Sequence, residues 1–178
     1  MANTYTLIAS STVGSGGAAT ISFGSIVGTY TDLLIKFSGR NNTGSLYVDD
    51  LKIVFNSDTN TARYSQKQLY GNSTAAASSS NTNLGCFAVF GLNGTVTTAS
   101  TFSNTEIYIP NYAGSNQKSI SVDASVETND AAANHSSLAL IAGLYNQTTA
   151  ITQIDLSSYN GYSFAQYSTA YLFGIKSS

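Results

Sequence analysis

The sequence predicts an all-β protein: an antiparallel, jelly-roll-like sandwich of two sheets and about ten strands, in a single domain over residues 1–178. Apolar and polar residues alternate with a period of two along most of the chain, which is typical of half-buried strands. Turn-forming residues separate these segments at fairly regular intervals, as in sandwich folds. No segment has a convincing helical period, and short connections favour a jelly roll or a related sandwich over alternating strands and helices.

The clearest pair of strands is expected in residues 105–127, TEIYIPNYAGSNQKSISVDASVE. In its first half, Ile107 and Ile109 alternate with polar and aromatic neighbours, and in its second half serines alternate with apolar residues. The segment N-Y-A-G-S-N between them is rich in residues that tolerate turn dihedrals. Pro110 is expected to close the first strand where no ladder donor is needed.

The other strands are justified by the same alternation or by short apolar runs. The segment 63–71 is more polar and is expected to be an edge strand or an exposed arm, and the low-complexity segment 72–83 a flexible surface loop. The last strand is apolar almost to its end and is expected to be held within a sheet. In all, strands are expected at residues 5–10, 19–26, 30–38, 46–55, 84–92, 98–109, 118–127, 138–145, 151–156 and 169–175.

The charge content argues against several classes of partner. Asp, Glu, Lys and Arg make up 9% of the chain, against about 25% in a typical soluble domain. With a net charge of −2 and no cluster of Lys and Arg, we expect neither nucleic acid nor an anionic membrane surface as a partner. The composition favours a rigid β-domain whose faces are partly covered by neighbouring subunits.

The chain has one cysteine, Cys86, so no intrachain disulfide is possible, and a small buried side chain in a strand is expected there. The N-terminal segment lacks the basic start and the apolar run of a signal peptide. No apolar run approaches the ~18 residues that a membrane-spanning helix needs. We therefore expect synthesis in the cytosol without a cleaved signal.

Possible catalytic groups are sparse. His135 is the only histidine, and no G-x-S-x-G motif accompanies it, so a loop histidine is the preferred interpretation. Glu106, Asp123 and Glu127 are candidates for the paired carboxylates of a glycosidase. The sequence does not show whether they share a face, and outward charges that keep strands soluble are the preferred interpretation. We expect no catalytic residues and no enzymatic activity.

A possible metal site is the segment N-S-D-T-N, which places side-chain oxygens at Asn56, Asp58 and Asn60, as in the first half of a calcium loop. The glycine and the distal glutamate of such a loop are missing. A turn closed by Asn and Asp side chains explains the segment better. We expect no metal and no cofactor.

The most informative local feature is a tyrosine-rich loop, S-S-Y-N-G-Y-S-F-A-Q-Y-S, before the last strand. Tyrosine offers a large contact area at a low cost in conformational entropy, which is why binding loops favour it. The loop is a candidate surface for contact with a protein or a glycan. Alternatively, Phe164 and Tyr167 enter the core as the last strand begins. The candidate contact residues are Tyr159, Tyr162, Phe164 and Tyr167.

Several segments, in order along nearly the whole chain, resemble one family. They are T-Y-T-L-I-A-S-S-T-V, T-Y-T-D-L-L-I-K-F-S-G-R, Y-S-Q-K-Q-L-Y-G-N, E-I-Y-I-P-N-Y-A-G-S-N-Q-K-S-I-S-V, S-L-A-L-I-A-G-L-Y-N and T-A-Y-L-F-G-I-K. Together they are similar to a family of small virion structural proteins of tailed bacteriophages, especially those of aquatic bacteria and cyanobacteria. The similarity is a pattern over many positions and contains no catalytic signature.

This resemblance implies a non-enzymatic virion component with a jelly-roll-like sandwich. It implies a homo-oligomer, with a trimer as the expected state, on the exterior of the capsid. The expected role is that of a capsid decoration (cement) protein that bridges subunits of the major capsid protein. The alternative is an adhesin of a tail or head fibre that binds a host surface glycan.

Overall fold

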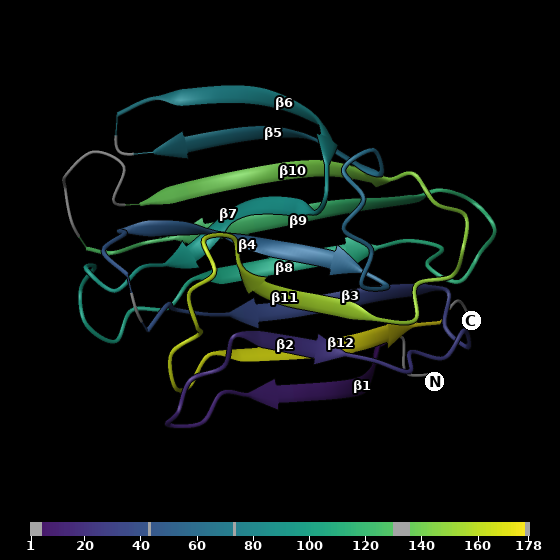
Figure 1. Cartoon of the computed structure of the whole chain (residues 1–178), viewed down its shortest axis with the longest axis horizontal. Helices are drawn as coiled ribbons and strands as arrows, with labels where there is room; N and C mark the ends of the chain where they lie inside the picture. Colours follow the sequence, from purple (N-terminus) through teal and green to yellow (C-terminus); the bar gives the residue numbers. More distant parts are fainter. Residues whose placement is uncertain (1–4, 43, 73, 130–135, 177–178) are drawn as a thin grey trace.

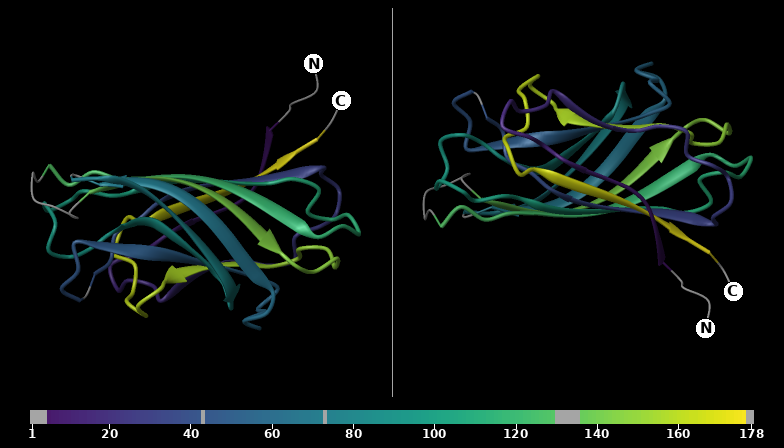
Figure 2. Two further views of the ribbon diagram at one scale, coloured as in Figure 1. Left: turned by 90° about the horizontal axis from the view of Figure 1, so that it is seen from above. Right: turned by 90° about the horizontal axis from the view of Figure 1, so that it is seen from below.

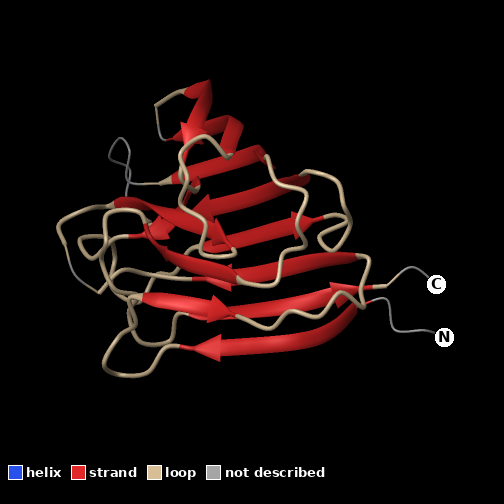
Figure 3. Cartoon of the chain, turned by 45° about the vertical axis from the view of Figure 1, so that its right-hand side comes forward, coloured by secondary structure: helices blue, strands red, loops and turns tan. Residues whose placement is uncertain are grey.

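The computed structural model describes residues 5–42, 44–72, 74–129 and 136–176, and all regular secondary structure in these ranges is β-strand (Figure 3). None of these residues forms a helix that is long and apolar enough to cross a membrane. The strands are β1 (Tyr5–Thr12), β2 (Thr20–Phe23), β3 (Asp32–Ser38), β4 (Val48–Phe55), β5 (Tyr64–Asn72), β6 (Ala76–Leu84), β7 (Phe87–Asn93), β8 (Asn104–Ile109), β9 (Lys118–Val126), β10 (Ser137–Tyr145), β11 (Ile154–Ser158) and β12 (Thr169–Ile175).

Eight of these strands form a jelly roll, in which the chain is folded as four nested antiparallel pairs. β1 pairs with β12, β2 with β11, β3 with β8, and β4 with β7. The larger sheet therefore contains the order β1-β12-β3-β8, and the smaller sheet has the order β2-β11-β4-β7 (Figure 1). The expected all-β, jelly-roll-like sandwich is confirmed.

Two insertions widen the larger sheet beyond the jelly roll. β5 and β6 are inserted between β4 and β7, while β9 and β10 are inserted between β8 and β11. They continue the larger sheet in the order β8-β9-β10-β5-β6. The larger sheet thus has eight strands among the described residues, and the smaller sheet covers only part of one of its faces (Figure 1).

The two sheets pack face to face, and their inward side chains form one apolar core (Figure 2). The alternation expected for residues 105–127 is confirmed, because Ile107 and Ile109 are fully buried and β8 pairs with β9. Burial of a large apolar side chain is worth about 1.5–3 kcal/mol. At one end of the core, four aromatic rings pack with centroids 4.8 to 5.6 Å apart: Phe55, Tyr64, Phe87 and Tyr145.

Strand β7 lies at the edge of the smaller sheet, and the inserted strand β5 protects that edge. The side-chain amide of Gln66 donates a hydrogen bond to the carbonyl of Ala88 (2.7 Å) and accepts one from its N–H (3.0 Å). The amide thereby takes the place of a neighbouring strand. Further along, the ring of Tyr70 packs on that of Phe90 with centroids 5.1 Å apart. Unpaired edges attract other strands, and these contacts occupy part of this edge within the chain.

The prediction for residues 72–83 was wrong. The part 76–83 belongs to β6, which pairs with β5 and forms an edge of the larger sheet. Because β6 is largely exposed, its small polar residues show no apolar alternation. Most of the segment 63–71 belongs to β5, which lies between β10 and β6, so neither an edge strand nor an exposed arm is correct.

Candidate functional site

The outer face of the larger sheet carries an uncovered apolar surface on β10 and β5. We call it the leucine face, and it consists of Leu69, Leu138, Leu140, Ala142 and Leu144. Its four leucines are 58%, 59%, 54% and 38% exposed, in that order. Alternate residues of a strand point to the same side, and Leu69 is paired directly with Leu140, so these side chains form one continuous strip.

Small polar residues border this strip on both sides. On β9, Ser121 is paired with Ala142, and Ser125 with Leu138. On the other side, serines of β6 lie beyond β5. Serine side chains rise less far from a sheet than leucines do, so the leucines are the most prominent apolar groups of this region. Apolar patches of this kind, rimmed by polar residues, mark interaction sites.

A shallow hollow of about 650 Å³ crosses the leucine face where the small side chain of Ala142 stands beside larger neighbours. Lys67 and Leu69 of β5 line it together with Leu140 of β10 and Ser121 of β9. A second hollow of about 410 Å³ continues it toward Leu144. The surface therefore offers room for the side chains of a partner.

Two opposite charges flank the leucine face. Lys67 of β5 is paired with Ala142 on one side of the strip, and Asp123 of β9 is paired with Leu140 on the other. Both side chains are exposed, and neither forms a hydrogen bond or ion pair with any residue that the structure describes. A partner with charges in the reverse arrangement could satisfy both.

The structure settles which of the candidate carboxylates share a face. Glu106 lies directly opposite Asp123 on the exposed side of the sheet, and it forms an ion pair with Lys36 of β3. Glu127 instead accepts hydrogen bonds from the N–H groups of Thr128 (2.9 Å) and Asn129 (2.8 Å) just after β9. Glu106 and Asp123 are thus neighbours in a row of outward charges.

The tyrosine-rich loop divides into exposed and packed residues. Tyr159 is 52% exposed and Tyr167 is 68% exposed, so both remain available for contact. Phe164 is fully buried and packs on Phe37 with ring centroids 5.4 Å apart, so it is a core residue and leaves the candidate contact set. Tyr162 is partly buried. Its ring lies close to Gly44, which has a φ of +94°, and the Cβ of any other residue at that position would lie 2.6 Å from the ring.

The buried carboxylate of Asp49 fastens this loop to the sandwich. It accepts hydrogen bonds from the side chains of Asn41 (2.8 Å), Ser158 (2.5 Å) and Asn160 (2.6 Å) and from the N–H of Asp50 (2.8 Å). A buried charge is tolerated when hydrogen bonds satisfy it. Asp49 therefore connects the start of β4, the segment after β3 and the loop after β11.

Two cations secure other connections without a carboxylate. Arg40 donates hydrogen bonds to oxygens of Thr95, Thr97, Thr98 and Thr101 in the loop after β7. The ammonium group of Lys118 binds the carbonyls of three loop residues, Gly114, Asn116 and Thr148. Burial lowers the pKa of both Arg40 and Lys118. Single basic residues in a sequence carry no signal that would predict these roles.

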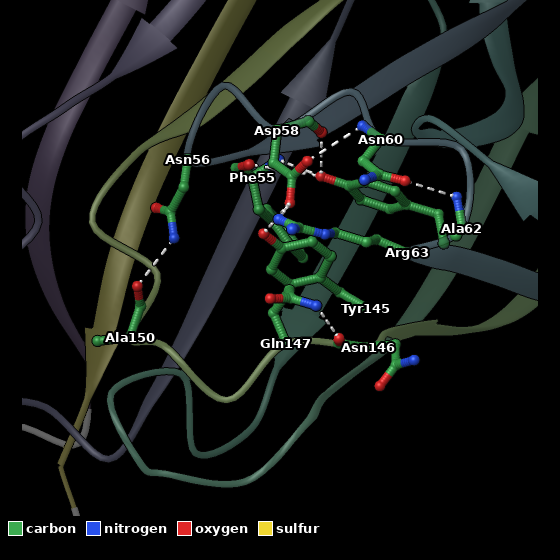
Figure 4. A network of polar contacts seen from close by, with 11 residues as sticks. Phe55, Asn56, Asp58, Asn60, Ala62, Arg63, Tyr145, Asn146, Gln147 and Ala150 are labelled. Atoms are coloured by element: carbon green, nitrogen blue, oxygen red, sulfur yellow. Dashed lines mark hydrogen bonds and ion pairs between the residues drawn. The ribbon is translucent and has the colours of Figure 1, made fainter.

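The segment with Asn56, Asp58 and Asn60 is a hydrogen-bonded turn (Figure 4). Asn56 donates to the carbonyl of Ala150 (2.9 Å), and Asp58 accepts from Arg63 (2.5 Å) and from the hydroxyl of Tyr145 (2.7 Å). Burial alone would raise the pKa of Asp58, but these hydrogen bonds outweigh it and the pKa is lowered. Within the described ranges, no group of three or more His, Cys, Asp and Glu side chains is arranged to hold a metal ion.

Two other predicted features remain. Cys86 is buried, as expected, but it lies in the short turn between β6 and β7 and not in a strand. His135 lies outside the described residues. No protein-family model, curated protein or solved structure matches this chain.

Proposed function

We propose that this protein is a non-enzymatic structural component of a bacteriophage particle. Its role would be that of a capsid decoration protein on the particle exterior, which bridges and stabilises subunits of the major capsid protein. The protein would act as a homo-oligomer, with a trimer as the expected state. This proposal rests on the family resemblance of the sequence and on the character of the exposed surface.

The leucine face is the observation that carries a structural role. It extends over neighbouring strands of the twisted larger sheet (Figure 2), and covering its exposed leucines with another protein would lower the free energy. Burial of one leucine is worth about 1.5–3 kcal/mol. A specific protein contact buries about 1,600 Å² in total. Repetition of such a contact over many copies multiplies its effect on a shell.

The anchored loops also support this role. Asp49, Arg40 and Lys118 each connect segments that are distant in the sequence, so the connections between strands are fastened to the sandwich. A protein that bridges neighbouring subunits works by geometry, because a rigid body holds its attachment points at fixed distances. The low charge of the chain agrees with a subunit whose faces are covered.

The copy number of this protein in purified particles of the encoding phage tests the proposal. Quantitative mass spectrometry against the major capsid protein should give a ratio near one to one or a simple fraction of it, with hundreds of copies in each particle. A complete absence from purified particles would contradict a virion role.

The exposure of Tyr159 and Tyr167 favours a second candidate, an adhesin of a tail or head fibre that binds a host surface glycan. Their rings are available for stacking on sugars, and the loop that carries them is held in place by Asp49. This candidate predicts only a handful of copies in each particle. It also predicts that Tyr159→Ala and Tyr167→Ala variants lose binding to host cells, while a Leu140→Ser variant keeps it.

A further inference from the structure

We infer that copies of this chain associate through the leucine face, with the β9 side of one copy against the β5 side of the next. This inference rests on the proposed homo-oligomeric role and names the surface that would serve it. It begins with the strip itself. β10 is apolar on both sides: Ile141 and Tyr145 are buried in the core, while Leu138, Leu140 and Leu144 point outward and remain exposed.

The charges beside the strip are complementary to those of a second copy. Asp123 lies on the β9 side and Lys67 on the β5 side, and neither has a partner among the residues described in its own chain. When the β9 side of one copy meets the β5 side of another, Asp123 of the first approaches Lys67 of the second. Opposite charges across an interface fix its register and exclude wrong partners.

This contact determines the direction of the symmetry axis. Rotation about an axis parallel to β10 keeps every residue at its own level along the strands. Asp123 is level with Leu140 and Lys67 with Ala142, so the two charges are offset by two residues, or roughly 7 Å, which a lysine side chain can span. An axis perpendicular to the strands would place β5 against β5 and leave Asp123 without a partner.

With this axis, each leucine of one copy faces the same leucine of its neighbour. The hollow lined by Lys67 and Ala142 gives room for side chains of the neighbour's β9. The same arrangement closes as a pair or as the ring of three proposed above. β10 has nine residues, which is roughly 30 Å, and four strands are about 19 Å wide. A face of roughly 600 Å² in each copy reaches the lower part of the range for specific contacts.

The test measures the mass of the purified chain in solution by light scattering and by sedimentation over a dilution series. The wild-type protein should have two or three times the chain mass of 18.6 kDa. Lys67→Glu and Asp123→Lys should each weaken association by about tenfold or more, because each brings like charges together. The double variant Lys67→Glu/Asp123→Lys should recover association, because it exchanges the two charges.

Lys176→Glu is the matched control, since it makes the same change of charge at an exposed site far from the leucine face. It should leave the mass unchanged, while Leu140→Ser should lower it without a change in circular dichroism. A wild-type monomer at all concentrations overturns the inference, and so does a double variant that stays dissociated. An oligomer that none of these changes affects overturns the assignment of the contact to the leucine face and leaves the homo-oligomer in place. The copy number in particles tests the proposed virion role independently.

Discussion

The outer faces of the two sheets differ in chemistry. The smaller sheet presents Asp50 and Lys52 from β4 and Asp155 from β11 on its outer side. The larger sheet presents the leucine face at one end. Both outer faces carry charges, but none of the strands β2, β4, β7 and β11 of the smaller sheet has a large apolar side chain as exposed as the leucines of the leucine face. This difference is the reason why the proposed partner contact is placed on the larger sheet and not on the smaller one.

Within the two sheets, the largest expected effect tests whether the two sides of β10 differ in the monomer. Ile141→Ala should lower the free energy of unfolding by about 2–5 kcal/mol, because Ile141 is 3% exposed and its loss leaves a cavity in the core. Leu140→Ala should change it by no more than about 0.5 kcal/mol. Urea denaturation at concentrations where the chain is monomeric provides the measurement. Equal losses in both variants would show that the outer side is already covered within the chain.

The smaller sheet offers a test of its charged side through Asp50. Burial, and secondarily the charge of Asp49, raises the pKa of Asp50 to about 6. The folded chain therefore binds more protons than the unfolded chain between about pH 4 and pH 6, and stability falls as the pH rises through this window by up to about 3 kcal/mol.

Asp50→Asn should remove this loss, so that the variant is more stable than the wild type at pH 7 and similar to it at pH 4. Denaturant midpoints measured from pH 4 to pH 8 provide the test, with Asp155→Asn as a control on the same face. A pH dependence that is identical in the Asp50→Asn variant and the wild type would assign the effect to another group.

A smaller effect is expected from the carboxylate that holds the tyrosine-rich loop. Asp49→Ala removes the acceptor shared by Asn41, Ser158 and Asn160, and it should cost about 1–3 kcal/mol because buried donors lose their partner. Hydrogen exchange should accelerate at the amide of Tyr162, which donates to the Ser158 hydroxyl, more than at amides of β9. Unchanged exchange in the loop would show that its backbone contacts suffice.

The smallest effect is expected at the exposed tyrosines. Tyr159→Ala and Tyr167→Ala should each change the free energy of unfolding by no more than about 0.5 kcal/mol, because both rings are mostly in water. Phe164→Ala in the same loop should cost about 3–5 kcal/mol. Thermal or urea denaturation of the three variants compares them directly. A large loss at Tyr167 would place its ring against the protein.

The sequence predicted the fold well where alternation was clear, as for Ile107 and Ile109 of β8. It failed for β6, because a strand with two exposed sides needs no apolar alternation, and its pairing with β5 is visible only in three dimensions. The leucine face was missed for a related reason. The segment S-L-A-L-I-A-G-L-Y of β10 is apolar on both sides, and sequence alone cannot show that the smaller sheet covers only one.

The tyrosine-rich loop illustrates the same limit at the level of single residues. Phe164 and Tyr167 are three positions apart in one loop, yet Phe164 is fully buried and Tyr167 is even more exposed than Tyr159. Asp49 and Arg40 carried no local signal, because their partners come from segments distant in the sequence. Their roles depend on the closed jelly roll, which brings those segments together.

The nested pairing of strands also fixes the order in which the chain can be completed. Tyr5 of β1 pairs with Ile175 of β12, so β1 has no partner in its sheet until nearly the whole chain has been synthesised. Closure of a long loop costs entropy, and folds dominated by distant pairings form slowly. The hairpins β5–β6 and β8–β9 need only local contacts. We therefore expect these hairpins to form before β1 pairs with β12, so that the exposed residues Tyr5 and Leu7 receive their neighbouring strand late.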